Sequence, residues 1–174
     1  MPVDPESPEP ADGAPAAGRF PGIPPEAARV LAGLGALVTG DEPARGLNPA
    51  LRHGAALAAA RWPGSGIGAL AADLPALRPA ELDLGLRAAA HWEHAFVPDA
   101  SGTGTTLYAA RPGARFWPRF GPRSAEQHRA AGAAELSLPG LASLRRDVDQ
   151  PPDLSAASDL GVGPRTAAVA ALLA

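Results

Sequence analysis

A short run without a polar side chain places the strongest constraint on the fold of this chain. Residues 67–72 read Ile-Gly-Ala-Leu-Ala-Ala and stand between the glycine-rich segment 64–66 and Asp73. Apolar runs of this length between turn residues are typical of strands buried on both faces of a parallel sheet. The run therefore predicts a central strand.

Helical and strand patterns alternate along the rest of the chain. Pro25 and Pro79 suit first helical turns, and Asn48-Pro49 suits an N-cap followed by the first helical residue. The predicted helices cover residues 25–32, 49–61, 79–91, 124–131 and 153–160, and the predicted strands cover residues 36–39, 67–72, 95–97 and 105–109. Such alternation predicts an α/β fold, a three-layer sandwich around a mostly parallel sheet.

The length fits one domain preceded by a tail. The chain has 174 residues, and about 100 to 200 residues per domain is usual. Residues 1–19 are rich in Pro and acids and hold almost no large apolar side chain, so we expect a disordered tail there. Residues 20–174 are expected to form a single domain.

Composition and charge exclude several classes of function. The net charge is −3, the basic residues are all Arg, and no basic cluster suited to nucleic acid is present. Without Cys, disulfides, zinc-thiolate sites and thiol nucleophiles are excluded, which leaves oxygen and nitrogen ligands. The sequence start has no signal-peptide pattern, and no uncharged run approaches the roughly 18 residues of a membrane span. We expect a cytoplasmic protein without nucleic-acid or membrane partners.

Three carboxylates are candidates for binding a hard cation. Asp73 directly follows the predicted central strand, and ligands of open parallel sheets bind beyond the carboxyl ends of the strands. Asp147 and Asp149 stand at i and i+2, so in extended backbone they point to one face. Carboxylates of this kind suit Mg²⁺, which also takes water and substrate phosphates. The alternatives are a turn-capping role for Asp73 and a surface stretch of residues 145–149 neutralised by its own arginines.

Two further segments suit an anion. Residues 101–106 combine flexible Gly backbone with four hydroxyls, although a plain turn before a Thr-rich strand is the alternative. Residues 120–124 lead into the predicted helix at Ser124, where Ser124 and Gln127 form a capping-box pattern and free N–H groups favour an anion. Together the two segments favour a bound phosphorylated acid, while Ser124 alone is also adequate as a plain cap.

The histidines are weaker signals. His91 and His94 stand at a predicted helix end without a third ligand nearby in sequence, which favours a solvated helix terminus over a metal site. His128 is interpreted as a packing or supporting residue and not as a base.

Several of these segments, in this order, resemble the guanylyltransferases of coenzyme F420 biosynthesis, which act on phosphoenolpyruvate or 2-phospho-L-lactate. The resemblance covers about residue 35 to the C-terminus. It is carried by Gly46-Leu47-Asn48, Ala72-Asp73-Leu74-Pro75, Gly102-Thr103-Gly104-Thr105-Thr106, Phe120-Gly121 with Ser124 and His128, Arg145-Arg146-Asp147-Val148-Asp149, and Leu160-Gly161-Val162-Gly163-Pro164.

The resemblance implies a nucleotidyltransferase of the molybdopterin-guanylyltransferase type. Such an enzyme would join the GMP part of GTP to phosphoenolpyruvate, giving enolpyruvoyl-2-diphospho-5'-guanosine and pyrophosphate, with 2-phospho-L-lactate as the alternative acceptor. Carried over by motif position, the roles would be acid binding for Thr106, Gly121 and Ser124, catalysis and Mg²⁺ binding for Asp73 and Asp149, Mg²⁺ binding for Asp147, and nucleotide contact for Asn48.

The resemblance also has a departure. Family members carry a strand, a Lys-containing phosphate-binding loop, and a further strand and helix ahead of the Gly-Leu-Asn segment, whereas this chain has a Pro-rich segment there and no Lys. We therefore expect the fold to be N-terminally truncated. The second hypothesis is a non-catalytic remnant that binds a phosphorylated acid, and a homodimer stays open as an alternative to a monomer.

Overall fold

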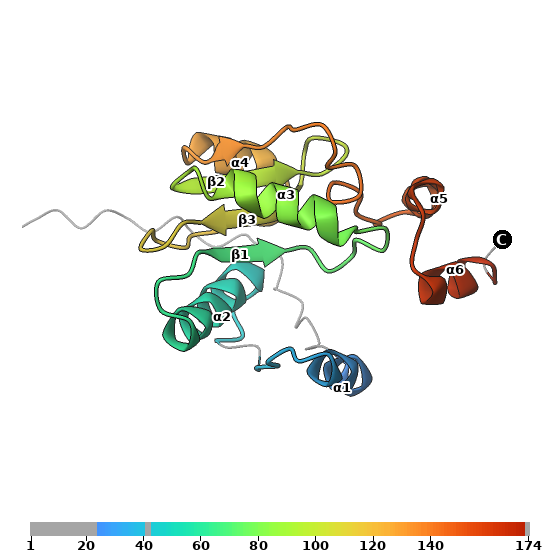
Figure 1. Cartoon of the computed structure of the whole chain (residues 1–174), viewed down its shortest axis with the longest axis horizontal. Coiled ribbons are helices and arrows are strands. Elements are labelled where there is room, and N and C mark those ends of the chain that lie inside the picture. The colour runs from blue at the N-terminus through green and yellow to red at the C-terminus, as the bar shows by residue number, and fades with distance from the viewer. Residues whose placement is uncertain (1–23, 41–42, 173–174) are drawn as a thin grey trace, which may run out of the picture.

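A four-stranded sheet lies between helices in the computed structural model, which describes residues 24–40 and 43–172 (Figure 1). The predicted tail, residues 1–19, lies outside the described residues. In chain order the elements are α1 (Pro25–Gly33), α2 (Leu47–Arg61), β1 (Ile67–Leu70), α3 (Pro79–Ala89), β2 (His94–Pro98), β3 (Thr105–Ala110), α4 (Ser124–Ala130), β4 (Ala134–Glu135), α5 (Pro151–Leu160) and α6 (Pro164–Ala170).

The sheet is mixed, so the prediction of a mostly parallel sheet was wrong. Its strand order is β1-β3-β2-β4, with β3 antiparallel to both β1 and β2, and β2 parallel to β4. The physical reason is the short link between β2 and β3, because a parallel pair needs a crossover of about a dozen residues or more. β1, β2 and β4 consequently share one direction, and β3 runs against them as the partner in a hairpin with β2.

The strand β1 lies at the edge of this sheet, and its prediction as a central, doubly buried strand was wrong. Within the described residues β1 pairs only with β3, in the register Ala69 opposite Tyr108. Ala69 is buried, whereas Gly68 and Leu70 are exposed. The prediction of a strand at residues 36–39 was wrong, because this segment is irregular backbone. Its apolar side chains alone do not form a strand, since none of the strands in the described residues pairs with it.

The predicted helices all form, although α2 and α5 each begin two residues before the predicted start and two predicted caps are wrong. Gly46 is the N-cap of α2, so Asn48 lies inside the first turn and does not cap it. Arg123 is the N-cap of α4, with a left-handed φ of 55°, and the expected capping box of Ser124 and Gln127 is not formed. A capping box does form at α5, between Gln150 and Asp153. β4 and α6 were not predicted.

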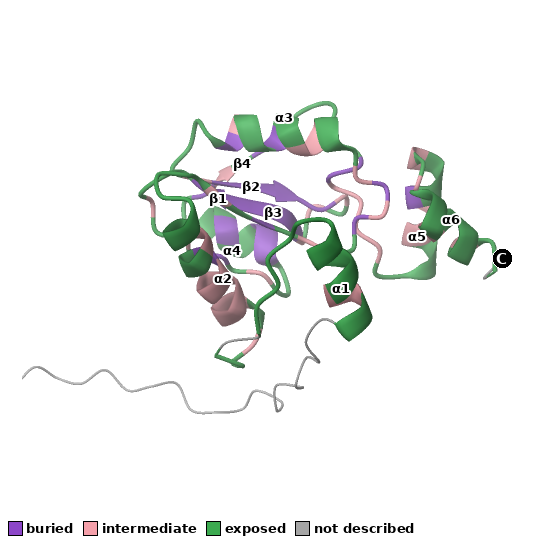
Figure 2. Ribbon diagram, turned by 60° about the horizontal axis from the view of Figure 1, so that its bottom comes forward, coloured by how far each residue is buried: buried purple, intermediate pink, exposed green. Residues whose placement is uncertain are grey.

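Helices cover both faces of the sheet, as expected for three layers (Figure 2). On the face covered by α3, Val97 and Leu107 pack with Leu141 and Leu144, which lie in the loop between β4 and α5. On the face covered by α4, Phe96 and Tyr108 pack with Ala125. Alternate residues of β2 and β3 thus divide between two apolar clusters, as the side-chain period of two requires.

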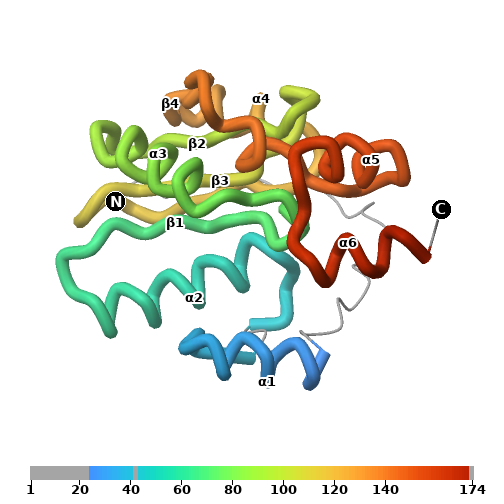
Figure 3. Tube along the Cα trace, turned by 45° about the vertical axis from the view of Figure 1, so that its right-hand side comes forward, coloured from blue at the N-terminus to red at the C-terminus, as the bar shows by residue number. Residues whose placement is uncertain are grey.

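Helix α2 runs alongside the edge strand, and α1 lies on the far side of α2 from the sheet (Figure 3). α2 contacts β1, and Ala55 is its buried residue. α5 and α6 lie beyond the ends of β1 and β2, where the Gly163 N–H donates to the Pro75 carbonyl at 3.4 Å. None of the helices in the described ranges is both long enough and apolar enough to cross a bilayer.

The close packing of α3 on Leu144 gives a test of this arrangement. A Cβ added at Gly85 would lie 2.8 Å from Leu144 Cδ2, and Leu144 is fully buried. Gly85→Ala should lower the free energy of unfolding by about 1 kcal/mol, because overpacking outweighs the helix-forming gain of Ala. Urea denaturation measures the change. Gly54→Ala, in α2 with open space around the new Cβ, is the matched control and should be stabilising; equal effects of the two changes would contradict this packing.

Candidate functional site

The candidate site is a cavity at the end of the sheet where β1 and β2 finish and β3 begins. Its volume is about 590 Å³. The end of β1, the β2–β3 loop, the first turns of α2 and the segments 120–124 and 147–149 line it. Because β1 and β2 run in the same direction, their carboxyl ends bring residues distant in sequence together, as expected for ligand sites of α/β sheets.

Carboxylates gather on one side of this cavity. Asp73 and Asp99 follow β1 and β2, and Asp147 and Asp149 come from the loop before α5. The Val148 N–H donates to the Asp73 carbonyl oxygen at 3.1 Å, which fixes the acidic segment beside the end of β1. The three predicted metal ligands therefore line one cavity.

Asp147 lies partly buried among these carboxylates. Burial raises the pKa of its carboxyl from the ordinary 3.8 to about 6, and the negative charges of Asp99, Asp149 and Asp73 act in the same direction. The Arg145 guanidinium, two residues earlier in the chain, donates instead to the carbonyl oxygens of Pro98 and Asp99, at 3.1 and 2.9 Å. The acidic side of the cavity is thus suited to attract a cation.

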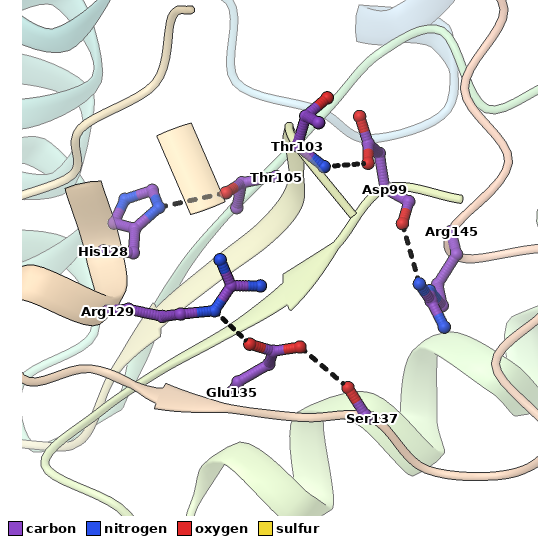
Figure 4. A network of polar contacts seen from close by, with 8 residues as sticks. All are labelled: Asp99, Thr103, Thr105, His128, Arg129, Glu135, Ser137 and Arg145. Carbon is purple, nitrogen blue, oxygen red and sulfur yellow. Dashed lines mark hydrogen bonds and ion pairs between the residues drawn. The ribbon is translucent and has the colours of Figure 1, made fainter. Parts of the chain in front are cut away.

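Asp99 shapes the hydroxyl-rich loop that the sequence singled out. Its carboxylate accepts hydrogen bonds from Ser101 Oγ at 2.9 Å, Thr103 N at 3.0 Å and Gly104 N at 2.8 Å. Figure 4 shows the bond to Thr103. A Cβ on Gly104 would lie 2.5 Å from Asp99 Oδ2, so the loop requires glycine there. Sequence reasoning missed Asp99, although it follows a strand just as Asp73 does, and that same signal would have found it.

Another part of the cavity lining consists of backbone and hydroxyl groups. Gly121 and Ser124 line it, and the Ala125 N–H donates to the Thr103 carbonyl at 3.1 Å, which joins α4 to the Asp99 loop. Thr106 is different: it is fully buried, its Oγ1 donates to the Val97 carbonyl at 3.4 Å, and its neighbour Thr105 lines the cavity instead. Substrate binding by Thr106 stays a prediction.

The turn before α4 has two residues with positive φ, and a side chain of α2 hydrogen-bonds the residue that precedes it. Gly121 has φ +132° and Arg123 has φ +55°, and the Ser124 N–H donates to the Gly121 carbonyl at 3.1 Å. The Asn48 amide hydrogen-bonds both to the N–H and to the carbonyl of Phe120. Asn48 is not among the residues that line the cavity, where Leu47 and Leu51 represent α2. Nucleotide contact by Asn48 stays a prediction.

His128 is buried and hydrogen-bonds residues in and next to the cavity lining. Its Nε2 accepts the Arg119 N–H at 2.9 Å, so the proton is on Nδ1, which donates to Thr105 Oγ1 at 3.0 Å. Burial, and then the charge of Arg119, lowers the pKa of this imidazole to about 4. The neutral ring therefore links α4, β3 and the loop between them, in line with its interpretation as a supporting residue.

The other histidines lie away from the cavity. His94 Nε2 is 2.9 Å from the Arg115 carbonyl oxygen, and His91 is exposed in the turn after α3. No group of three or more His, Cys, Asp or Glu is close enough to hold a metal by itself within residues 24–40 and 43–172. The cavity carboxylates accordingly form an open acidic surface and not a closed ligand cage.

Comparisons with known proteins find close relatives. A protein of Thermomonospora curvata named phosphoenolpyruvate guanylyltransferase is 63% identical over 147 residues, which are 84% of this chain and 64% of the relative. Proteins of the same name from Streptomyces avermitilis and Streptosporangium roseum are 58% and 57% identical, over 86% and 83% of this chain and 69% and 65% of their own lengths. The chain thus spans about two thirds of the length of these relatives. No protein-family model matches the chain.

Replacing Asp99 tests whether its carboxylate holds the loop. Asp99→Asn puts an NH₂ group against one or more N–H donors, so we expect a loss of about 1–3 kcal/mol in the free energy of unfolding and faster exchange of the Thr103 and Gly104 amides. Urea denaturation and amide hydrogen exchange measure the two effects. Asp159→Asn, at an exposed position of α5, is the control. Unchanged exchange at both amides would show that the carboxylate does not order the loop.

The raised pKa of Asp147 predicts a particular pH dependence. Between pH 4 and 6 the folded state holds this proton more tightly than the unfolded state, so its contribution to stability is lost as pH rises through about 6. Relative to Asp147→Asn, the wild type should lose about 1 kcal/mol between pH 4 and 7, a value reduced for partial exposure and screening. Urea titrations of both proteins at each pH give the difference, in which His128 cancels. A wild type that gains stability relative to the variant over this range would refute the assignment.

Proposed function

The chain belongs to the phosphoenolpyruvate guanylyltransferase family, and from that premise we propose that it transfers the GMP part of GTP to phosphoenolpyruvate. The products would be enolpyruvoyl-2-diphospho-5'-guanosine and pyrophosphate. We place this reaction in the cytoplasm, as a step of coenzyme F420 biosynthesis. The names of relatives at 52–63% identity support the guanylyltransferase activity and the acceptor acid.

One observation supports the proposal: carboxylates and groups suited to bind an anion line a single cavity. Asp73, Asp147 and Asp149 line the same cavity, of about 590 Å³, as Gly121 and Ser124. Joining two phosphorylated substrates requires both kinds of group, because a cation has to offset their combined negative charge while hydroxyl and N–H groups hold the acceptor. The volume lies within the usual range of small-ligand sites.

Mg²⁺ fits the carboxylates of this cavity. Hard oxygen donors are its preferred ligands, and it usually takes one or two protein carboxylates and completes its shell with water and substrate phosphates. An open acidic surface is therefore adequate, and a bound cation would offset the negative charges that, after burial, help to raise the pKa of Asp147. One or two of Asp73, Asp147 and Asp149 would hold the ion, which supplies charge neutralisation at the phosphates when bound.

In the proposed reaction the residues of the chain mainly orient the two substrates. An oxygen of the acceptor's phosphate forms a bond to the α-phosphorus of GTP, and the bond from that phosphorus to the oxygen bridging to the β-phosphate breaks. Pyrophosphate carries away the electron pair of the broken bond. Ser124 and the Gly121 turn would hold the acceptor, and the Asp99 loop would shape the floor of the site between β2 and β3.

Pyrophosphate release tests the proposal and its alternatives. The 174-residue chain is assayed with GTP and Mg²⁺, with phosphoenolpyruvate and 2-phospho-L-lactate in parallel. We expect pyrophosphate release in the assay with phosphoenolpyruvate and none in the assay with 2-phospho-L-lactate. The reverse result would show that 2-phospho-L-lactate, and not phosphoenolpyruvate, is the acceptor. Binding of phosphoenolpyruvate by calorimetry without turnover would overturn the activity of this chain and favour the acid-binding remnant.

Asp73→Asn tests the cation side of the cavity. The side chain of Asp73 is exposed, so the variant should fold normally while losing about a hundredfold or more of Mg²⁺-dependent pyrophosphate release, because one charge of the cation site is gone. Initial rates over a Mg²⁺ titration and circular dichroism give the two readouts. Asp159→Asn is the control for the loss of one negative charge, and undiminished turnover in Asp73→Asn would eliminate the metal assignment.

A further inference from the structure

The side chain of Asn48 makes a two-pronged contact with a residue far away in sequence. Its Nδ2 donates to the Phe120 carbonyl at 2.8 Å, and its Oδ1 accepts the Phe120 N–H at 2.8 Å, across a separation of 72 residues. The amide thus satisfies both backbone groups of one residue, as a neighbouring strand would. Among the twenty side chains, only Asn and Gln offer this donor and acceptor pair on one planar group.

The residue held in this way precedes the turn that lines the cavity. Gly121 at φ +132° and Arg123 at φ +55° both occupy the left-handed half of backbone space, which costs free energy for a non-glycine residue such as Arg123. Backbone of this kind persists where its surroundings fix it. The Asn48 contact fixes the turn on its N-terminal side, and the Gln127 Nε2 bond to the Pro122 carbonyl at 2.9 Å fixes it within α4.

A second contact joins α2 to the same loop. The Arg52 guanidinium lies 4.2 Å from the centroid of the Trp117 ring, and Arg115 lies 3.9 Å from that centroid. Asn48 and Arg52 are four residues apart in α2 and therefore share one helix face. This face of α2 holds the loop at two points, of which only the Asn48 contact reaches its backbone beside Gly121.

We propose that Asn48 is a positioning residue for the acceptor site: it holds Phe120 so that Gly121 and Ser124 present their groups to the phosphorylated acid. The inference rests on the proposed function, since that function makes the 121–124 turn the acceptor site. A positioning role of this kind affects binding of the phosphorylated acid, whereas the predicted nucleotide contact would affect binding of GTP. Loss of the Asn48 amide should weaken binding of the acid and leave GTP affinity unchanged.

Two variants of Asn48 separate positioning from general stability. Asn48→Asp keeps the shape and the acceptor for the Phe120 N–H but sets a carboxylate oxygen against the Phe120 carbonyl. Asn48→Ala removes both bonds. His53→Ala, on the next turn of the same helix and outside the contact, is the matched control. Each protein is titrated calorimetrically with phosphoenolpyruvate and with GTP, and the exchange rate of the Phe120 amide is measured by NMR.

For both Asn48 variants we expect the Kd for phosphoenolpyruvate to rise about tenfold or more, which corresponds to the loss of one or two well-formed hydrogen bonds. The Phe120 amide should exchange about tenfold faster in Asn48→Ala, where its acceptor is gone. His53→Ala should match the wild type in both readouts. Asn48→Asp, which retains that acceptor, keeps the test decisive if Asn48→Ala does not fold.

Failure of the inference and failure of the proposed function give different results. Wild type that binds phosphoenolpyruvate, together with Asn48 variants that bind it equally well, would overturn the positioning role alone. Loss of GTP affinity with unchanged acid affinity would also overturn it, in favour of nucleotide contact. A folded wild-type chain that does not bind phosphoenolpyruvate would instead overturn the acceptor site, and with it the inference that rests on it.

Discussion

The carboxylate of Asp99 is the interaction on which the site depends. It stands where β2 ends and accepts three hydrogen bonds from the loop that turns the chain into β3. This turn makes β2 and β3 antiparallel and brings Thr105 to the edge where β1 also ends. The loop in turn accepts the Ala125 N–H, so α4 is held against it. One buried acid thereby organises a hairpin, a helix and the floor of the cavity.

Two parts of the cavity lining differ in their chemistry. The carboxylates lie at and beyond the strand ends, where burial and then the neighbouring negative charges raise the pKa of Asp147. The segment before α4 is held by neutral side chains, because Asn48 Oδ1 accepts the Phe120 N–H and His128 Nε2 accepts the Arg119 N–H. This division keeps the proposed acceptor site free of the repulsion that would arise if carboxylates also held the turn.

Sequence reasoning predicted local chemistry better than strand arrangement. Asp73, identified by its position after a strand, lines one cavity together with Asp147 and Asp149, identified by their spacing of two residues, and with Gly121 and Ser124, identified by the helix start that they precede or form. The sheet direction was mispredicted because apolar content does not distinguish a hairpin from a crossover, whereas the length of the 99–104 link does. The roles of Asn48 and Asp99 depend on contacts across folded backbone, and composition and spacing do not encode these.

The contacts of the Trp117 ring with Arg52 and Arg115 make this residue an intrinsic fluorescent reporter of the loop. A cation over an indole interacts with its π-electrons, so the emission of Trp117 depends on whether α2 and the loop are in contact. Trp62 has one such neighbour, Arg61, from within its own helix end, which does not change when α2 moves relative to the loop. Fluorescence of the unlabelled protein therefore distinguishes a docked from an undocked α2, and it does so beside the turn that faces the cavity.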